Sequence, residues 1–275
     1  MSAVLLALAS AALFGGMTVA LRMGMRGLDD SGGAALATVL AALGVALVAA
    51  AVDLDLEGAW PFLLAGLLAP GASQVLFTLA VGEVGASRTS VMVGGAPLIA
   101  VTIAIVFLDE PLSPPLLLGA LAIVSGGALL AAERDRPGDL RRIGLAYAAG
   151  AAALFAIRDN LARAFHTDAS PGTAAAATLV AGTVAAALWT RRRPSTRELR
   201  RFAPAGVLFG LSYVCLFEAY FRGKVTVVSP LVATESLWGV ALSALLIRQT
   251  EGMGRRIAVG ALLVVAGGVL IGVSR

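Results

Sequence analysis

Ten long apolar runs, separated by short polar loops, constrain the fold of this chain more than any other feature. The runs cover residues 2–21, 33–52, 59–81, 86–107, 114–132, 142–165, 172–190, 202–221, 226–247 and 255–273. A helix of about 20 apolar residues crosses the roughly 30 Å hydrocarbon core of a bilayer. Backbone amides in lipid must be hydrogen-bonded internally, and runs of this length rich in Ala and Leu favour helices over barrel strands. We therefore predict an all-α integral membrane protein with ten transmembrane helices.

The composition agrees with this class, since 59% of the residues are hydrophobic and only 14% are charged. A soluble domain carries about 25% charged residues. The basic residues lie in short loops, where they act as topology signals and lipid contacts, so we expect no nucleic-acid partner. The single cysteine, Cys215, excludes an internal disulfide. The first run has no basic residue before it, so we expect a membrane helix that is retained and not a cleaved signal.

The sequence repeats itself at a shift of 141 residues, which takes Gly119 to Gly260. GALAIVSGGALL at 119–130 then falls on GALLVVAGGVLI at 260–271. The same shift pairs residues that glycine-rich composition does not explain: Arg22 with Arg163 and Glu110 with Glu251.

We therefore predict two five-helix repeats, residues 1–135 and 140–275. Because five is an odd number, the second repeat enters the membrane from the opposite side. Such inverted repeats are typical of secondary transporters, whose substrate site lies near the midplane between the repeats. Most Lys and Arg residues lie in the loops after spans 1, 3, 5, 7 and 9, which predicts that both termini lie outside the cytoplasm.

The repeated half resembles the EamA-type branch of the drug/metabolite transporter superfamily. The first half carries Pro97 in its fourth helix, then Phe107-Leu108-Asp109-Glu110, then a glycine-rich fifth helix with Gly126-Gly127. The second half departs from this pattern, with Trp238 in place of the proline and the acid at Glu251. The resemblance implies a transporter in the plasma or inner membrane that exports amino acids, drugs or other metabolites.

Motifs for catalysis are absent from the sequence: there is no GxxxxGK[ST] phosphate loop, no HExxH and no GxSxG. The one histidine, His166, lies at a helix end. We expect no cofactor, no metal and no enzymatic activity. The partners that we expect are a small-molecule substrate, membrane lipids and protons as the coupling ion.

Glu235 is the acid nearest the middle of an apolar run, 226–247, that contains no other charge. An ionisable group at that depth costs free energy unless it faces a partner or water. Glu235 is therefore the best candidate for carrying a coupling proton or binding a substrate ammonium, and a buried structural pair is the alternative. Trp238, one turn further on, could stack on a flat or cationic substrate.

A polar cluster in the sixth span, Arg158, Asp159 and Arg163, is the candidate gate. Asp159 and Arg163 are four residues apart and can meet on one helix face. Glu218 in the eighth span ends on the same membrane side and could pair with Arg158 or Arg163. A structural ion pair near the membrane surface is the alternative.

Aromatic and amide side chains inside the spans are further candidates for substrate contact: Phe14, Gln74, Phe77, Tyr213 and Phe217. Plain packing or an interfacial aromatic belt is the alternative for the aromatic residues.

Three prolines, Pro70, Pro97 and Pro230, predict kinks because each removes a backbone donor. A freed carbonyl in lipid needs a partner, so these kinks should face protein or water. We expect spans 1, 3, 4, 6, 8 and 9 to line a cavity and spans 5 and 10, with glycines seven apart, to form scaffold contacts.

The function that the sequence favours is a secondary active exporter of small organic metabolites or drugs that works by alternating access. A carrier or flippase for lipid-linked solutes remains an alternative, as does a non-transporting membrane protein or an intramembrane enzyme.

Overall fold

A computed structural model of the chain describes residues 2–26, 31–52, 54–84, 89, 92–111, 113–131, 142–166, 169–191, 193–247 and 255–273. Every regular element within these residues is helical. The helices are α1 (Ala3–Met25), α2 (Ser31–Ala50), α3 (Trp60–Gly66), η1 (Leu67–Ala72), α4 (Ser73–Val84), α6 (Ala96–Phe107), α7 (Pro114–Ala131), α8 (Arg142–Ala164), α9 (Pro171–Thr190), α10 (Thr196–Arg222), α11 (Val225–Val232), α12 (Glu235–Ile247) and α13 (Arg255–Val273).

The helices follow the predicted apolar runs closely. The main extension is α10, which begins six residues before its apolar run because Ser195 and Glu198 form a reciprocal capping box. Among the described residues, five helical segments are long and apolar enough to cross a membrane by length and composition: 3–25, 32–50, 60–84, 171–190 and 196–222. The chain is therefore a multi-pass membrane protein, and the full set of ten spans stays a prediction.

Three of the predicted spans are interrupted near their middle. The third contains the π-helical segment η1, where Ala69 leaves helical geometry and precedes a cis peptide bond to Pro70. The fourth turns at Gly94-Gly95 before α6 begins. The ninth is divided into α11 and α12 by a turn at Ala233-Thr234. Under the 141-residue shift, the breaks in the fourth and ninth spans fall within two residues of each other.

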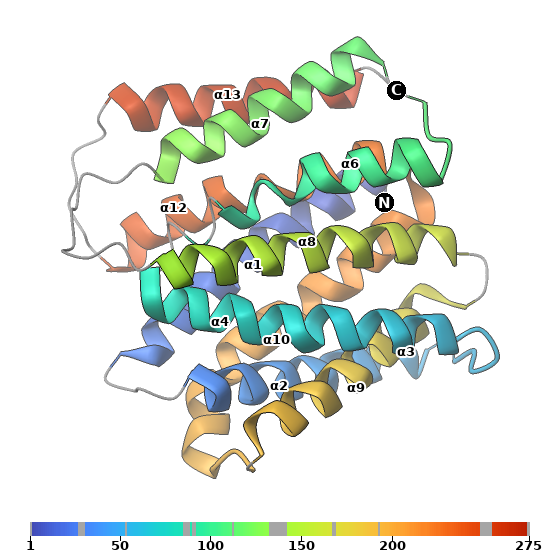
Figure 1. Ribbon diagram of the computed structural model, residues 1–275, viewed down its shortest axis with the longest axis vertical. Helices are drawn as coiled ribbons and strands as arrows, with labels where there is room; N and C mark the ends of the chain where they lie inside the picture. The colour runs from blue at the N-terminus through green and yellow to red at the C-terminus, as the bar shows by residue number, and fades with distance from the viewer. Residues whose placement is uncertain are drawn as a thin grey trace.

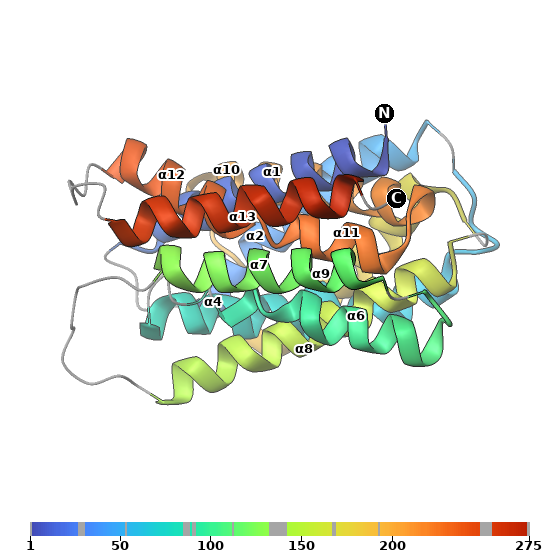
Figure 2. The same ribbon diagram turned by 90° about the horizontal axis from the view of Figure 1, so that it is seen from above.

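The helix packing has the same internal symmetry as the sequence. The repeat shift takes α1 to α8 and α4 to α10, and α1 packs on α10 just as α8 packs on α4. The helices α2 and α9, which the shift also relates, pack on each other. The long helices run along one common direction in both views, and the start of α1 lies at the same end of the bundle as the end of α13 (Figures 1 and 2).

The pair α7 and α13 lies at one edge of the bundle (Figure 1). A Cβ atom at Gly119 would lie 2.9 Å from the carbonyl oxygen of Gly267, and a Cβ at Gly267 would lie 2.5 Å from the carbonyl oxygen of Gly119. Any larger residue would push the two helices apart. The scaffold contact that the glycine spacing predicts is therefore present.

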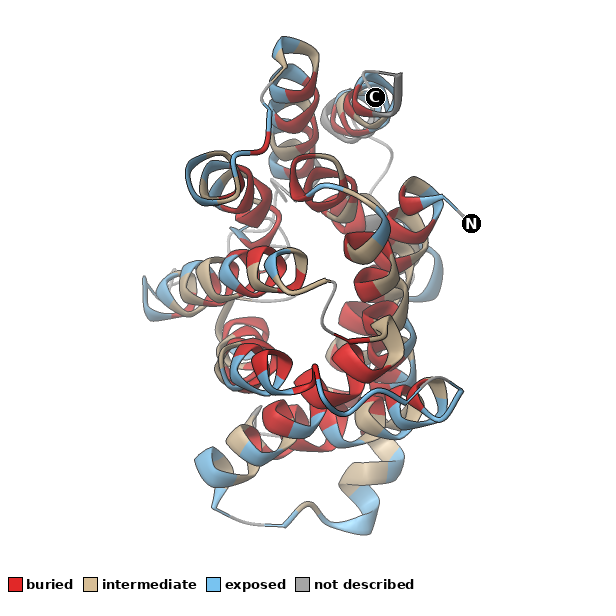
Figure 3. Cartoon of the chain, turned by 90° about the vertical axis from the view of Figure 1, so that its right-hand side faces the viewer, coloured by how far each residue is buried: buried red, intermediate tan, exposed pale blue. Residues whose placement is uncertain are grey.

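Buried residues face the inside of the bundle when it is seen end-on (Figure 3). Phe14 is at the centre of an aromatic group in which its ring lies 5.6 Å from Phe77, 6.1 Å from Phe155 and 5.8 Å from Phe209, centroid to centroid. Edge-to-face contacts of this kind favour one fixed arrangement of side chains. The group therefore joins α1, α4, α8 and α10 beside the candidate site.

Candidate functional site

A small cavity lies between α1, α8, α10 and the interrupted fourth and ninth spans. It holds about 40 Å³ of water-accessible space, enough for a few water molecules. Its lining combines apolar, hydroxyl and charged side chains: Ser10, Phe14, Val93, Ala96, Pro97, Phe155, Arg158, Asp159, Ser212, Tyr213, Leu216, Ser229, Val232, Ala233 and Glu235. Five of the six spans expected to line a cavity contribute to it, and the third span does not.

Glu235 is the first residue of α12 and is 6% exposed. The turn before it is held by short-range bonds, since Thr234 donates from its amide and its hydroxyl to the Leu231 carbonyl. An acid in the first turn of a helix is favoured by the helix dipole. None of the described residues donates a hydrogen bond to the Glu235 carboxylate. Glu235 is thus buried, borders the cavity and is left able to take a partner from within it.

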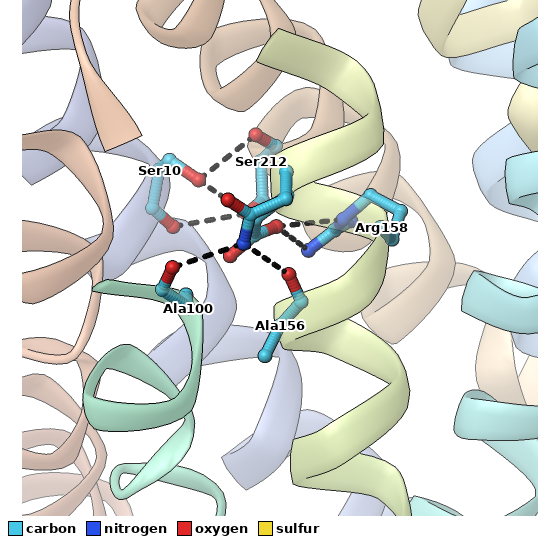
Figure 4. A network of polar contacts seen from close by, with 7 residues as sticks. Ser10, Ala100, Ala156, Arg158 and Ser212 are labelled. Carbon is cyan, nitrogen blue, oxygen red and sulfur yellow. Dashed lines mark hydrogen bonds and ion pairs between the residues drawn. The ribbon is translucent and has the colours of Figure 1, made fainter. Parts of the chain in front are cut away.

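Arg158 and Asp159 form a buried ion pair on α8, with 2.7 Å from both Nε and Nη2 of Arg158 to Oδ1 of Asp159 (Figure 4). The guanidinium lies 4.9 Å from the ring centre of Tyr213 and 5.5 Å from that of Phe155. The cation–π contacts and the ion pair together hold the charge in the protein interior. The Nη1 atom of Arg158 is buried without a hydrogen-bond partner among the described groups.

Asn160 fastens α8 to its neighbour at the same level. Its Nδ2 atom donates to the carbonyl oxygen of Ala100 at 3.0 Å and to that of Ala156 at 2.9 Å (Figure 4). The bond to Ala100 links α8 to α6. The polar residues of α8 therefore fix two helices of the cavity wall to each other and also place charged groups in that wall.

Ser10 and Ser212 were not singled out in the sequence, yet they exchange hydrogen bonds across the α1–α10 contact. Each hydroxyl donates to the carbonyl oxygen of the other residue at 3.0 Å (Figure 4). Both residues line the cavity. The one signal that could have identified them is a hydroxyl within an apolar run, which is common in membrane helices and therefore weak.

The repeat suggested by the sequence is also found by comparison with known families. The family model described as "EamA-like transporter family" matches residues 1–132 and again residues 142–273. The chain belongs to the EamA-like transporter family. Membership implies a transporter of the drug/metabolite type. The family is one of transporters and not of enzymes.

Solved structures show the same fold. One described as "Crystal structure of protein" has a TM-score of 0.80 at 18% identity, over 99% of this chain and 96% of its own. At this identity the likeness is evidence for the fold alone. No curated protein matches the chain.

The gate pairs expected for this EamA-like chain are corrected by the structure. Asp159 pairs with Arg158 and not with Arg163, whose Nη1 donates to the Tyr220 carbonyl at 3.2 Å. Glu218 pairs with Arg222, 2.6 Å away and one turn further along α10. Arg222 is half exposed and lies on the same helix face, so Glu218 finds this partner without reaching α8.

Three of the residues predicted to bind substrate or couple transport, Phe14, Tyr213 and Glu235, line the cavity, and the other four lie elsewhere. Gln74, Phe77 and Phe217 are fully buried in the packed interior. Trp238 is 41% exposed and does not border the cavity. Trp238 is turned outward although Glu235, three residues earlier on α12, is buried.

The three prolines occupy different positions relative to the breaks. Pro70 lies within the interrupted third span. Pro97 is in the first turn of α6, where backbone amides have no acceptor within the helix, so the missing amide proton of Pro97 costs no helical hydrogen bond. The break in this span therefore lies before Pro97, at Gly94-Gly95, and not at Pro97 itself. Pro230 lies inside α11, three residues before the turn at Ala233. Pro97 is the one of the three that borders the cavity.

Proposed function

We propose that this EamA-like protein is a secondary active transporter that exports small organic metabolites or drugs across the plasma or inner membrane by alternating access. The observation that carries the proposal is the buried Glu235 at the break of the ninth span, bordering one cavity with the Arg158–Asp159 pair of the sixth. The export direction is proposed from the family resemblance.

The roles of the charges follow from their partners. Arg158 neutralises Asp159, whereas Glu235 has no hydrogen-bond donor among the described residues. Glu235 is therefore the group proposed to bind a coupling proton or a substrate ammonium. The hydroxyl of Tyr213 and the Nη1 atom of Arg158 are buried without described partners and would hydrogen-bond a polar substrate.

The cavity has room for water but is too small for a metabolite in this conformation. Substrate entry would require the walls to separate, and the breaks in the fourth and ninth spans are the natural places for such movement. Broken helices beside a midplane site are a recurring feature of transporters built from inverted repeats.

Transport by purified protein in proteoliposomes tests the proposal. A panel of amino acids, nucleosides and cationic drugs is first screened for thermal stabilisation, and the compounds that stabilise the protein are then assayed for uptake. An acidic interior should drive accumulation, because protons leaving the vesicle exchange for substrate entering it. A failure of every solute to move in any imposed gradient would contradict the transporter proposal.

Glu235→Gln tests the assigned role of the acid. We expect it to abolish accumulation driven by the pH gradient, while Glu57→Gln, which removes an exposed loop acid, leaves accumulation unchanged. Wild-type transport with its pH dependence intact in Glu235→Gln would refute the role of Glu235.

A further inference from the structure

The carboxylate of Glu110 lies outside the cavity and is not used in the proposed function. It is 8% exposed and accepts two backbone hydrogen bonds, from the amide of Val225 to Oε1 at 2.9 Å and from the amide of Thr226 to Oε2 at 2.8 Å. These are the first two residues of α11. Both carboxylate oxygens are therefore engaged at the amino end of a helix that is 115 residues away in sequence.

The sequence around each partner explains why the contact forms. Lys224 is the N-cap residue of α11 and makes no side-chain cap, since an ammonium group has no acceptor. The first amides of a helix need acceptors, and a carboxylate is favoured there by both hydrogen bonding and the helix dipole. Glu110 supplies from elsewhere in the fold the cap that α11 lacks locally.

The end of α6 is shaped to present Glu110. The amides of Leu108 and Glu110 both donate to the Ala104 carbonyl, and Asp109 between them has φ of 50°. This left-handed turn ends the helix and reverses the chain direction. An aspartate tolerates that conformation better than most residues, so Leu108-Asp109-Glu110 forms a turn that directs Glu110 back onto α11.

The contact joins the two repeats at the ends of α6 and α11 that lie away from the cavity. Glu110 belongs to the first region that matches the family and α11 to the second. The other ends of the two elements meet at the cavity, where Pro97 of α6 and Val232 of α11 are both part of the lining. A separation of α6 from α11 at the end where Glu110 lies would thus open a path from that membrane face to Glu235.

A groove borders this contact. It has a volume of about 580 Å³ and is lined by Ser2, Pro111, Ser113, Lys224 and Thr226, among others. Once the carboxylate moved away, solvent in this groove could hydrogen-bond the amides of Val225 and Thr226.

We propose that Glu110 is an inter-repeat latch: its carboxylate holds α11 against α6 and keeps closed the mouth of the pathway on the membrane face that carries Ser2. Glu110 acts through α11 as a positioning residue and does not touch the substrate. The proposal rests on the transport function proposed above, but the opening of the mouth is measured without any substrate.

The experiment measures the reactivity of one cysteine in the cavity wall. Val232→Cys is introduced with Cys215→Ala, and a membrane-impermeant maleimide is added from the face that carries Ser2. We expect Glu110→Ala to raise the labelling rate several-fold, because loss of the latch shifts the population toward the open mouth. Glu57→Gln, an exposed acid in a loop predicted on the same face, should leave the rate unchanged.

A second variant separates a latch from a simple helix cap. Glu110→Ala combined with Lys224→Asp gives α11 a local cap but no link to α6. We expect the thermal stability lost in Glu110→Ala to return while fast labelling persists. If labelling returns to the wild-type rate together with stability, or if Glu110→Ala folds and labels at the wild-type rate, the latch is refuted. Should Glu110→Ala fail to fold, the double variant alone tests the latch. A latch predicts that the double variant is stable and labels fast, whereas a simple helix cap predicts that it is stable and labels at the wild-type rate.

Discussion

Arg158 and Asp159 are neighbours in sequence on α8 whose side chains pair with each other, Nη2 to Oδ1 at 2.7 Å, in the protein interior. Consecutive residues on a helix point about 100° apart, so this pair forms because the arginine is long enough to curl back over Phe155 and Tyr213. Both members of this ion pair therefore belong to the same helix, α8. The pair is therefore neutral without a partner on another helix.

Breaking the pair should be far more costly than replacing it. Arg158→Met leaves a buried carboxylate unpaired and should destabilise the protein by about 3 kcal/mol or more, whereas Arg158→Met with Asp159→Leu should recover much of that loss. Thermal denaturation in detergent measures both. Arg222→Met, which breaks the half-exposed pair with Glu218, is the control and should cost less than about 1 kcal/mol. A double variant less stable than Arg158→Met would contradict this account.

The Ser10–Ser212 exchange should be measurable as coupling between α1 and α10. Ser10→Ala and Ser212→Ala should each cost about 0.5–1 kcal/mol of stability, because each removes a hydroxyl that donates across the contact. The double variant should lose less than the sum of the two, as expected for groups in one network. Strict additivity would show that the two hydroxyls act independently. Thr102→Val, which removes a bond within α6, serves as the reference.

Gly66 should tolerate no side chain, because a Cβ there would overlap the carbonyl oxygen of Thr178 on α9. Gly66→Ala should destabilise the protein by about 1–3 kcal/mol through overpacking. Gly44 is also helical, but apart from the backbone of its own helix and its chain neighbours no atom lies within 4 Å of the position that a Cβ would occupy, so Gly44→Ala should be neutral or stabilising by up to about 1 kcal/mol. Thermal denaturation of the two variants separates the cost of overpacking at Gly66 from the gain in helix propensity at Gly44. Equal changes in stability for the two variants would contradict the close α3–α9 contact.

Gln74 is a buried amide whose replacement by an apolar side chain should cost no stability. Neither its Nε2 nor its Oε1 atom has a hydrogen-bond partner among the described groups. Gln74→Leu should therefore leave stability unchanged or raise it by about 1 kcal/mol. Thermal denaturation in detergent measures the change. A large loss of stability would show that the amide is bonded in the folded protein, and Thr78→Val, which removes a bond to the Gln74 carbonyl, gives the scale of such a loss.

Much of the fold could be predicted from the chain because its signals are local. The apolar runs place the helices, and the similarity of GALAIVSGGALL to its counterpart at 260–271 reveals the repeat that the family comparison finds. The depth of Glu235 in its run also marked it as a candidate, and it does border the cavity. The break at Ala233-Thr234 lies three residues beyond Pro230, where the kink was predicted, and neither Ala233 nor Thr234 is itself a strong helix breaker.

The hydrogen-bond and ion-pair partners of individual side chains could not be predicted from sequence spacing alone. Arg163 was expected to meet Asp159 and instead bonds to the Tyr220 carbonyl, and Trp238 was expected near substrate and instead faces outward. The repeat marked Glu110 as a matched acid without indicating that it caps α11. Each of these outcomes depends on how one helix is rotated against another.

The order of amino acids is enough to establish a helical membrane protein of two related halves with an acid deep in its ninth apolar run. These properties follow from hydrophobic length and internal similarity, which need no knowledge of neighbours. Helix packing, in contrast, decides that Arg158 neutralises Asp159, that Glu235 is left without a described donor, and that Glu110 joins the halves. A side chain's partner is set by the register and rotation of packed helices, and those are determined by the sum of many contacts across the whole fold.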